Sequence, residues 1–294
     1  MNHPHIINLK EICTAGDQSV YLVFDYLEYD LAGLLMTLRD SSQRLSKNQV
    51  RSVVRALLDA VLYLHNADIV HRDMKSSNVL LGRDGSIKLT DFGLAKEYRL
   101  RSPYSSQPPR DENHYRTNTS RLMTNRVITL WYRPPEVLLG STAYGPEVDI
   151  WGVGCIMLEM AFGRPIFTGQ DEITQLEAIA ERIPGLMDCS HLTHPPWYPT
   201  VSEILAKITC KSFLESFAEQ LDEDAIDLAS KLLCLDPTRR ISAQQALQHP
   251  WLNDTSTEKL PVIEGEWHEY ECKQRNKRDK ANNSVRPLTS TGTD

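Results

Sequence analysis

Asp73, Asn78 and Asp91 are the side chains of this sequence best suited to chemistry. Two short, largely apolar segments, residues 79–81 and 87–89, flank a turn rich in Gly and Asp, and this pattern predicts a β-hairpin. Folding the hairpin brings the three side chains toward one end. Carboxylate and amide oxygens can hold Mg²⁺, and an Asp can accept the proton of an attacking hydroxyl. The group therefore suits phosphoryl transfer, which depends mostly on positioning and charge neutralisation.

Two motifs in this stretch resemble protein kinases. Residues 71–78 (His-Arg-Asp-Met-Lys-Ser-Ser-Asn) are similar to the catalytic loop, and residues 91–93 (Asp-Phe-Gly) to the metal-binding motif. Each motif alone recurs by chance, but both in this order, separated by a hairpin, are specific. The resemblance implies that Asp73 accepts the hydroxyl proton and that Lys75 steadies the transferred phosphate, which fits serine/threonine specificity. It also implies that Asn78 and Asp91 hold Mg²⁺. The alternative, ordinary turn aspartates, is disfavoured by the rest of the chain.

The elements that must position these groups follow from hydrophobic periodicity. Residues 5–12 and 20–26 are typical of short strands. Residues 46–66 are predicted to be a helix, opened by a capping box of Ser46 and Gln49. Residues 148–160 are apolar on nearly every side, which indicates a buried helix. Two further helices are expected at residues 224–235 and 242–249.

Composition excludes several classes of protein. The 294 residues, 41% of them hydrophobic, suffice for one large or two smaller domains. We expect neither a membrane span nor secretion, because no apolar run is long enough and the first residues lack a signal-peptide pattern. Six cysteines without a Cys-x-x-Cys pair argue against a zinc site or a disulfide framework. The net charge of −7 disfavours direct binding of nucleic acid.

The first two strands resemble the end of a kinase small lobe. By that resemblance Phe24 lies at the back of the adenine pocket, and residues Asp25 to Leu27 form the hinge. Leu80 completes the adenine site, and Asp30 is a polar residue near the ribose. Without the motifs downstream, two strands of an unrelated sheet would be the better interpretation.

A narrower resemblance is carried by residues 124–136, Thr-Asn-Arg-Val-Ile-Thr-Leu-Trp-Tyr-Arg-Pro-Pro-Glu. The string is similar to the cyclin-dependent kinases, and most similar to the transcriptional branch that phosphorylates the RNA polymerase II tail. It closes an activation segment over residues 91–136. Thr124 then matches a threonine that an activating kinase phosphorylates, and Arg72 and Lys96 are candidates to bind its phosphate. A plain loop threonine is the alternative.

The same resemblance assigns further residues. Val127 and Ile128 match the pocket for a proline after the target Ser or Thr, and Thr129 matches a catalytic residue that hydrogen-bonds near Asp73 and Lys75. Glu136 and Arg240 match the two partners of a buried ion pair, and Asp149 matches a residue that supports the catalytic loop. The last three residues belong to a structural frame.

The resemblance covers only part of a kinase. The sequence contains no Gly-x-Gly-x-x-Gly motif and no Val-Ala-Ile-Lys strand. We therefore predict an α+β protein with a kinase-like fold, mainly the helical C-terminal lobe. Residues 1–27 would be a remnant of the N-terminal lobe and hinge, 28–256 the C-terminal lobe, and 257–294 a disordered basic tail. Either the sequence is an incomplete version of an active kinase, or it is a genuine short product. We expect little or no turnover from these 294 residues alone.

Taken together, the motifs predict a serine/threonine kinase of the cyclin-dependent type that uses ATP and Mg²⁺. It would phosphorylate Ser or Thr followed by Pro, in the RNA polymerase II tail if the branch is right. A cyclin would be its partner if the full small lobe is present, and the family resemblance implies a nuclear location, with the cytoplasm as the alternative. The rival hypothesis is a non-catalytic, pseudokinase-like lobe that acts as a binding module. The intact catalytic residues argue against that rival, and the missing small lobe argues for it.

Overall fold

The computed structural model describes residues 2–14, 16, 19–98, 123, 128–186, 203, 208, 213–253, 258–261 and 268–275. Two predicted site residues, Thr124 and Val127, lie outside these ranges. Within the ranges, no helix combines the length and the apolar character that a membrane crossing would need.

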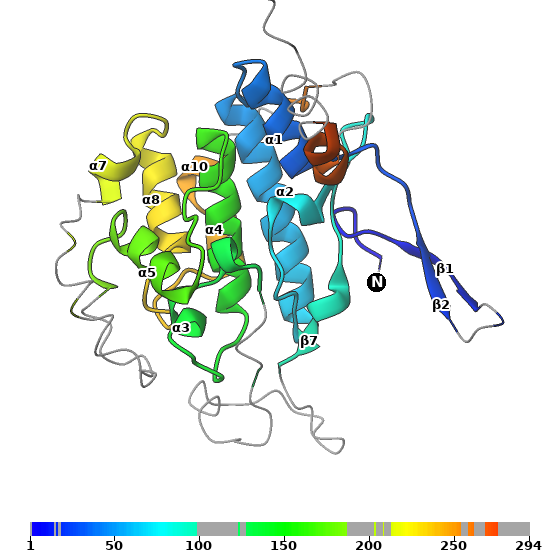
Figure 1. The fold of residues 1–294 in the computed structure, drawn as a ribbon, viewed down its shortest axis with the longest axis horizontal. Coiled ribbons are helices and arrows are strands. Elements are labelled where there is room, and N and C mark those ends of the chain that lie inside the picture. The colour runs from blue at the N-terminus through cyan, green and yellow to red at the C-terminus, as the bar shows by residue number, and fades with distance from the viewer. Residues whose placement is uncertain are drawn as a thin grey trace, which may run out of the picture.

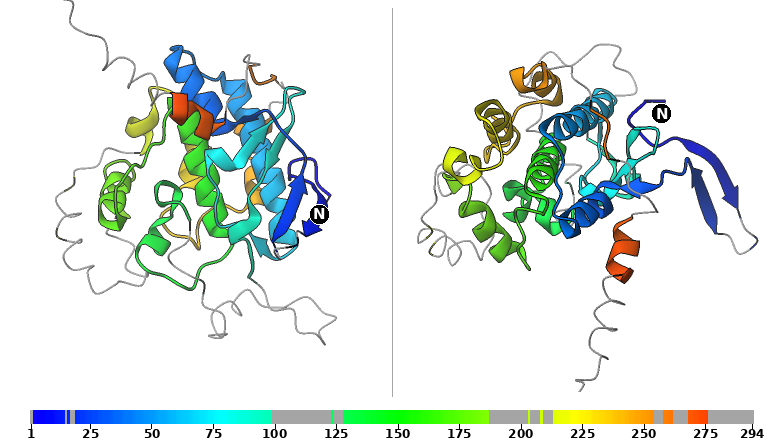
Figure 2. Two further views of the ribbon diagram at one scale, coloured as in Figure 1. Left: turned by 45° about the vertical axis from the view of Figure 1, so that its right-hand side comes forward. Right: turned by 90° about the horizontal axis from the view of Figure 1, so that it is seen from above.

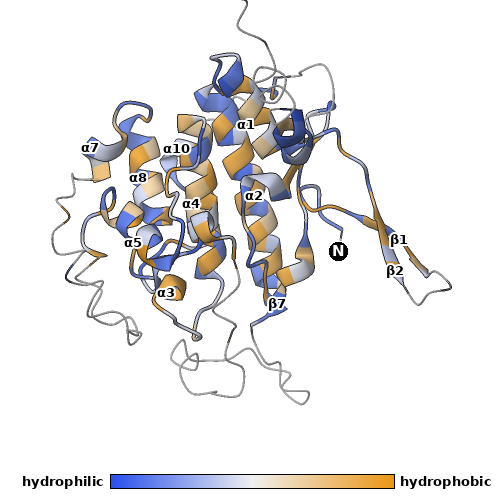
Figure 3. Ribbon diagram, in the orientation of Figure 1, coloured by the Kyte–Doolittle hydropathy of each residue, from blue (hydrophilic) through white to orange (hydrophobic). Residues whose placement is uncertain are grey.

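Two long helices, α2 (Lys47–Asn66) and α4 (Glu147–Phe162), pack side by side at the centre of the molecule (Figure 1). The predicted capping box opens α2, because the Ser46 hydroxyl accepts the N–H of Gln49 and the Gln49 side chain accepts the N–H of Ser46. In α4 every residue from Val148 to Met160 is buried, as predicted, and the helix is predominantly hydrophobic in Figure 3. Both predictions are confirmed.

Helix α4 also lies directly against the chain around Met74. A Cβ added to Gly152 would meet the Cβ of Met74 at 2.4 Å, so only glycine allows this approach. Close packing at this point brings the central helix under residues 71–78, which carry the predicted catalytic groups.

Shorter helices surround this pair: α1 (Leu31–Asp40), α3 (Pro135–Leu138), α5 (Glu172–Ala180), α7 (Phe213–Phe217), α8 (Glu223–Leu232), α9 (Ala243–Leu247) and α10 (Pro250–Asn253). Single 3₁₀ turns cover η1 (Ser76–Asn78), η2 (Phe92–Leu94) and η5 (Leu130–Tyr132). The helix predicted over residues 224–235 is α8, which ends three residues early, and the helix predicted over 242–249 is α9, with Ser242 as its N-cap.

Two small antiparallel sheets hold the turns of the site. The predicted hairpin is formed by β5 (Val79–Leu81) and β6 (Ile87–Leu89), and β3 (Tyr29–Asp30) adds to it in the order β3-β5-β6. Strands β4 (Ile69–Val70) and β7 (Lys96–Glu97) form a second pair. Gly85, at φ 91°, supplies the left-handed residue of the β5–β6 turn.

The strand expected over residues 5–12 is divided in the structure. The N–H of Ile7 donates to the carbonyl oxygen of Leu89 at 2.9 Å, and the N–H of Leu89 donates to that of His5 at 2.9 Å. Residues 5–7 thus occupy the free edge of β6, and Ile6 is 2% exposed. The predicted strand therefore begins only at Leu9. The alternating pattern of residues 5–12 could not show that the first three residues pair with a different sheet from the rest.

The remaining strands form a hairpin that stands apart from the helices. Strand β1 (Leu9–Thr14) pairs with β2 (Val20–Phe24), which ends two residues before the predicted boundary. Seen from above, this hairpin extends away from the helical body (Figure 2). Its apolar side chains are accordingly exposed, with Ile12 at 59% and Val20 at 61%.

Part of the predicted disordered tail is folded, which corrects that expectation for residues 268–275. Residues 269–275 are helical and lie beside α1 (Figure 1). Cys272 is 1% exposed and its Sγ contacts the Thr37 hydroxyl and the Gly33 carbonyl oxygen. The polar composition of the tail concealed this contact, since one buried side chain produces no periodic pattern.

Candidate active site

The β5–β6 hairpin brings Asn78 and Asp91 to neighbouring positions. Val79 pairs with Leu89, and the N–H of Thr90 donates to the carbonyl oxygen of Asn78 at 3.0 Å. Asn78 therefore lies opposite Thr90, and Asp91 is the next residue along the chain. A short-range turn is enough to create this proximity, which is why the sequence alone could indicate it.

Asp73 is the centre of a hydrogen-bond cluster. Its Oδ2 accepts from Lys75 Nζ at 2.6 Å and from Asn78 Nδ2 at 3.1 Å. Its Oδ1 accepts from the Thr129 hydroxyl at 2.9 Å and from the Thr129 N–H at 3.3 Å. Burial acts to raise the pKa of Asp73, but the hydrogen bonds from Lys75 and Thr129 outweigh burial and leave that pKa lowered. Asp73 is therefore ionised at neutral pH, and the four residues assigned to catalysis lie in one cluster.

The backbone of this loop is held by a buried carboxylate. Asp149 is 0% exposed and accepts the backbone N–H groups of His71 and Arg72, each at 2.9 Å. His65 Nε2 also lies 2.9 Å from it. Burial acts to raise the pKa of Asp149, but the contact with His65, the charge of His71 and the hydrogen bond from the Arg72 backbone together outweigh burial, so the pKa is lowered. An ionised acceptor can thus stabilise the left-handed conformation of Arg72, whose φ is 67°.

His71 connects this loop to the segment that carries Asp91. Its Nδ1 accepts the N–H of Asp73 at 3.2 Å, so its Nε2 carries the proton and donates to the carbonyl oxygen of Thr90 at 2.9 Å. The ring also packs edge-on against Phe92, with centroids 4.9 Å apart. The two motifs recognised in the sequence are therefore joined directly.

Asn78 and Asp91 have the chemistry that a magnesium site requires. The Nδ2 of Asn78 donates to Asp73, so its Oδ1 is directed elsewhere and accepts from no described donor. Asp91 is exposed, at φ 62°, and accepts the N–H of Gly93 at 3.3 Å. No described cluster of three His, Cys, Asp or Glu could hold a metal by itself. One amide and one carboxylate suit Mg²⁺, which binds few protein groups and completes its shell with phosphates and water.

Arg72 contacts Met123, the residue that precedes the predicted phosphorylation site in the sequence. Its Nε donates to the Leu94 carbonyl oxygen at 2.7 Å, and its Nη1 lies 3.8 Å from the Sδ of Met123 and 3.5 Å from the hydroxyl of Tyr144. Thr124 follows Met123 in the chain but lies outside the described residues, so its predicted contact stays a prediction. Lys96 is half-buried in β7, paired with Val70 of β4.

Ile128 adopts a conformation that is rare for a β-branched residue. Its φ is 70°, and its carbonyl oxygen accepts from Arg133 at 3.3 Å (Nε) and 3.0 Å (Nη2). The side chain is 6% exposed. The guanidinium thus occupies this carbonyl oxygen with two hydrogen bonds. Val127, its predicted partner in a proline pocket, lies outside the described residues.

The residues assigned to adenine differ in their surroundings. Leu27 is 5% exposed and Leu80 is half-buried, whereas Phe24 is 42% exposed at the end of β2. Asp25 forms an ion pair with Lys10 at 2.9 Å. Their assignment to a nucleotide stays a prediction.

Asp30, assigned near the ribose, has other hydrogen bonds. Its Oδ1 caps α1 by accepting the N–H of Gly33 at 2.7 Å, and its Oδ2 accepts the N–H of Glu269 at 2.8 Å. Only 5% of the residue is exposed, and burial raises its pKa. Asp30 is therefore the N-cap of α1, a role that the sequence analysis did not predict. A contact with ribose would compete with both bonds.

Glu136 and Arg240, predicted as a buried pair, are in contact. Arg240 Nη1 donates to Glu136 Oε1 at 2.8 Å and Nη2 donates to Oε2 at 3.0 Å. The side chains are 3% and 0% exposed. This pair joins α3, which ends the predicted activation segment, to the loop between α8 and α9.

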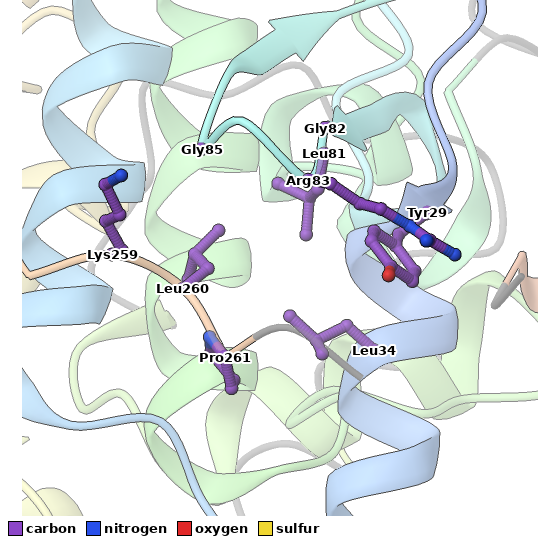
Figure 4. A pocket seen from close by; sticks show the side chains of 9 residues that line it. All are labelled: Tyr29, Leu34, Leu81, Gly82, Arg83, Gly85, Lys259, Leu260 and Pro261. Atoms are coloured by element: carbon purple, nitrogen blue, oxygen red, sulfur yellow. The ribbon is translucent and has the colours of Figure 1, made fainter. Parts of the chain in front are cut away.

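A pocket lies at the far end of the β5–β6 hairpin (Figure 4). It contains no residue that the sequence assigned to a site. The lining residues are Tyr29, Leu34, Leu81, Gly82, Arg83, Gly85, Lys259, Leu260 and Pro261. The candidate active site is instead at the opposite end of the hairpin.

Two contacts of the site were not foreseen from the sequence. His65 contacts Asp149 across the interface between α2 and α4. Glu159, near the end of α4, lies within hydrogen-bond distance of the hydroxyls of Ser76 and Tyr132, at 2.9 and 2.7 Å. A Glu inside an otherwise apolar helix was the available sign for the second contact, because such a residue needs a polar partner.

Comparison with known proteins also points to protein kinases. Residues 1–252 match the family model described as the protein kinase domain. CTD kinase subunit alpha of Schizosaccharomyces pombe is 38% identical over 283 residues, which cover 94% of this chain and 44% of that protein. Cyclin-dependent kinase 9 of Homo sapiens is 40% identical over 266 residues, covering 85% of this chain and 64% of that protein. The chain thus spans about half the length of the curated relatives it matches.

A solved structure shares the fold. The crystal structure of the yeast RNA Pol II CTD kinase CTDK-1 complex contains a chain that superposes with a TM-score of 0.72 at 35% identity. The match covers 89% of this chain and 80% of that chain. It extends well beyond the local motifs around Asp73 and Asp91.

Proposed function

The chain belongs to the protein kinase domain family, and we propose that it is a serine/threonine kinase of the cyclin-dependent type. The observation that carries the proposal is the cluster around Asp73, in which Lys75, Asn78 and Thr129 all contact one ionised carboxylate. A non-catalytic binding module would have no need of this arrangement. The relatives named above support the enzyme rather than the module.

Asp73 is the proposed proton acceptor. In the reaction the hydroxyl oxygen of a substrate Ser or Thr bonds to the γ-phosphorus of ATP, the bond from that phosphorus to the bridging oxygen breaks, and ADP leaves. The hydroxyl proton passes to Asp73, whose lowered pKa keeps it ionised and able to accept. The Lys75 ammonium, 2.6 Å from Asp73, stabilises negative charge on the transferred group.

Asn78 and Asp91 would hold Mg²⁺ through one amide and one carboxylate oxygen. When bound, the ion neutralises charge on the ATP phosphates. The protein's own contribution is to keep Asn78 Oδ1 free by directing Nδ2 at Asp73. Asn78 donates to Oδ2 of Asp73 and Thr129 donates to its Oδ1, so the carboxylate of Asp73 cannot rotate.

The conformation of Ile128 supports a preference for proline after the target residue. Its carbonyl oxygen already accepts from Arg133, so a substrate N–H at this point would have no acceptor. Proline has no N–H and loses nothing. Together with the names of the relatives, which include CTD kinase subunit alpha and the RNA Pol II CTD kinase complex, this supports Ser-Pro sites of the RNA polymerase II tail as substrate.

The proposal includes the regulation typical of the type. A cyclin is the proposed partner, Thr124 the proposed phosphorylation site with Arg72 and Lys96 as its cationic partners, and the nucleus the proposed location. The relatives' names and the position of Arg72 beside Met123 support these assignments. We also retain the division of the chain at residues 27 and 256, with ATP bound between Leu27 and Leu80 at the boundary.

The test measures phosphate transfer from ATP to a Ser-Pro heptad peptide. It uses the longest natural product that carries this sequence, isolated with its bound partners. Asp73→Asn should lower the rate at least about 10²-fold, the usual contribution of a general base, while peptide binding persists. Asp84→Asn, at the far end of the same hairpin, is the matched control and should leave the rate unchanged.

A second peptide tests the specificity. Replacing the proline by alanine should reduce transfer, because the new N–H has no acceptor at Ile128. Transfer that survives Asp73→Asn would refute the assignment of the base. Absence of transfer by the native protein, together with retained peptide binding, would favour the binding module.

A further inference from the structure

Glu159 is a buried carboxyl group in contact with two hydroxyls. It lies on α4 and is 4% exposed. Ser76 Oγ lies 2.9 Å from its Oε1, and the Tyr132 hydroxyl lies 2.7 Å from its Oε2. The two hydroxyl oxygens also lie 3.0 Å from each other. The three side chains therefore form a closed ring with three short oxygen–oxygen contacts.

The number of protons in this ring decides the state of Glu159. Each hydroxyl supplies one proton, and an ionised carboxylate supplies none. With Glu159 ionised, two protons must serve three contacts, and one pair of oxygens would face each other without a hydrogen. With Glu159 protonated, three protons serve three contacts in a cycle, from Glu159 to Tyr132, from Tyr132 to Ser76 and from Ser76 back to Glu159. No other described donor reaches these atoms.

The surroundings agree with a proton on Glu159. Burial raises its pKa to about 7, even though the hydrogen bonds from Tyr132 and Ser76 act in the opposite direction. Within the described residues Glu159 has no ion pair. The negative charge of Glu269, in the helix at 269–275, raises the pKa of Glu159 further. Burial also raises the pKa of Tyr132 and of Cys155, the nearby thiol on α4, so both stay neutral.

The ring joins the two segments that hold Asp73. Ser76 follows Lys75, and the N–H of Tyr132 donates to the Thr129 carbonyl oxygen at 2.9 Å. Lys75 donates to one oxygen of Asp73, alongside Asn78, and Thr129 donates to the other. Ten residues earlier on α4, ionised Asp149 holds the other end of the same loop.

We propose that Glu159 is a protonated positioning residue, whose proton closes the ring between Ser76 and Tyr132 and so aligns Lys75 and Thr129, two of the donors to Asp73. As the pH rises and the proton leaves, one of the three hydrogen bonds is lost. The link between the Lys75 segment and the Thr129 segment then loosens. The effect on catalysis rests on the proposed kinase function, whereas the protonation of Glu159 does not depend on it.

The proton is tested without any assay of activity. The protein is labelled with ¹³C at the glutamate carboxyls, and the resonance of Glu159 is identified by its absence from Glu159→Gln. Its titration midpoint is expected near 7, far above the ordinary value of 4.5. A midpoint at the ordinary value would overturn the proposal. If Glu159→Gln does not fold, Ser76→Ala keeps Glu159 in place and identifies the same resonance by its shift.

The positioning role is tested by the pH dependence of phosphate transfer. Glutamine at 159 also supplies a donor and an acceptor, so its ring keeps all three bonds at every pH. The ratio of the wild-type kcat to that of Glu159→Gln is expected to fall as the pH rises through about 7. A ratio that does not change with pH would overturn the coupling to Asp73. Failure of all transfer would refute the proposed function and leave the titration of Glu159 unaffected.

Discussion

Removal of the charge of Glu136 should be among the most destabilising single changes in this protein. Arg240 is fully buried and donates to Glu136 twice, at 2.8 and 3.0 Å. It also donates to the carbonyl oxygens of Glu147 and Cys234 and lies 5.1 Å above the ring of Trp151. Burial acts to lower the pKa of Arg240, but the charge and hydrogen bonds of Glu136, together with the charge of Glu147, outweigh burial and raise that pKa. Glu136→Gln would therefore leave a buried cation without its partner.

The expected loss is about 3–5 kcal/mol of the free energy of unfolding, the usual cost of a stranded buried charge. Glu147 can offset part of it. Burial raises the pKa of Glu147, and the charge of Glu136 raises it further. Without Glu136, Glu147 ionises more readily and attracts Arg240 in its place. The double variant Glu136→Gln/Glu147→Gln should then lose more stability than the two single variants added together.

Urea unfolding followed by far-UV circular dichroism measures these losses. The matched control is Glu172→Gln. It breaks an ion pair with Arg133 in which the Glu172 side chain is 51% exposed. That change should cost less than about 1 kcal/mol because solvent screens the pair. If Glu136→Gln costs no more than Glu172→Gln, at equal denaturant dependence, the buried pair does not stabilise the fold as argued.

Three further predictions concern α4. Gly152→Ala should lower the free energy of unfolding by about 1–3 kcal/mol, because the added Cβ would meet Met74 at 2.4 Å. The control is Gly16→Ala, whose added Cβ meets nothing within 4 Å and should leave stability unchanged. Equal urea midpoints for the two variants would contradict this prediction. Asp149→Asn should cost about 1–3 kcal/mol and speed hydrogen exchange of the loop amides it holds, and unchanged exchange would count against it. Stability should fall by about 3 kcal/mol as the pH rises from 4.5 to about 7, because the folded state holds the Glu159 proton more tightly than the unfolded chain, at ~1.36 kcal/mol for each pH unit. This contribution is fully present below 4.5 and is lost as the pH passes 7, and Glu159→Gln should lack it.

The sequence alone determined the local parts of this protein. The β5–β6 hairpin, the capped helix α2 and the buried helix α4 were all predicted, because turn residues, caps and periodicity act between near neighbours in the chain. The motifs around Asp73 and Asp91 indicated the family for the same reason, since their order and short spacing are visible without coordinates.

The tertiary structure decided which distant groups meet. Residues 5–7 pair with the edge of β6, and the N–H of Glu269, in the helix at 269–275, donates to Asp30. The sequence pattern of neither segment indicates what it packs against. The state of Glu159 is the clearest case. Whether a carboxyl carries a proton depends on which oxygens surround it and at what distance, and these oxygens come from three segments far apart in the chain. Only packing brings those segments together, so no local pattern could have indicated it.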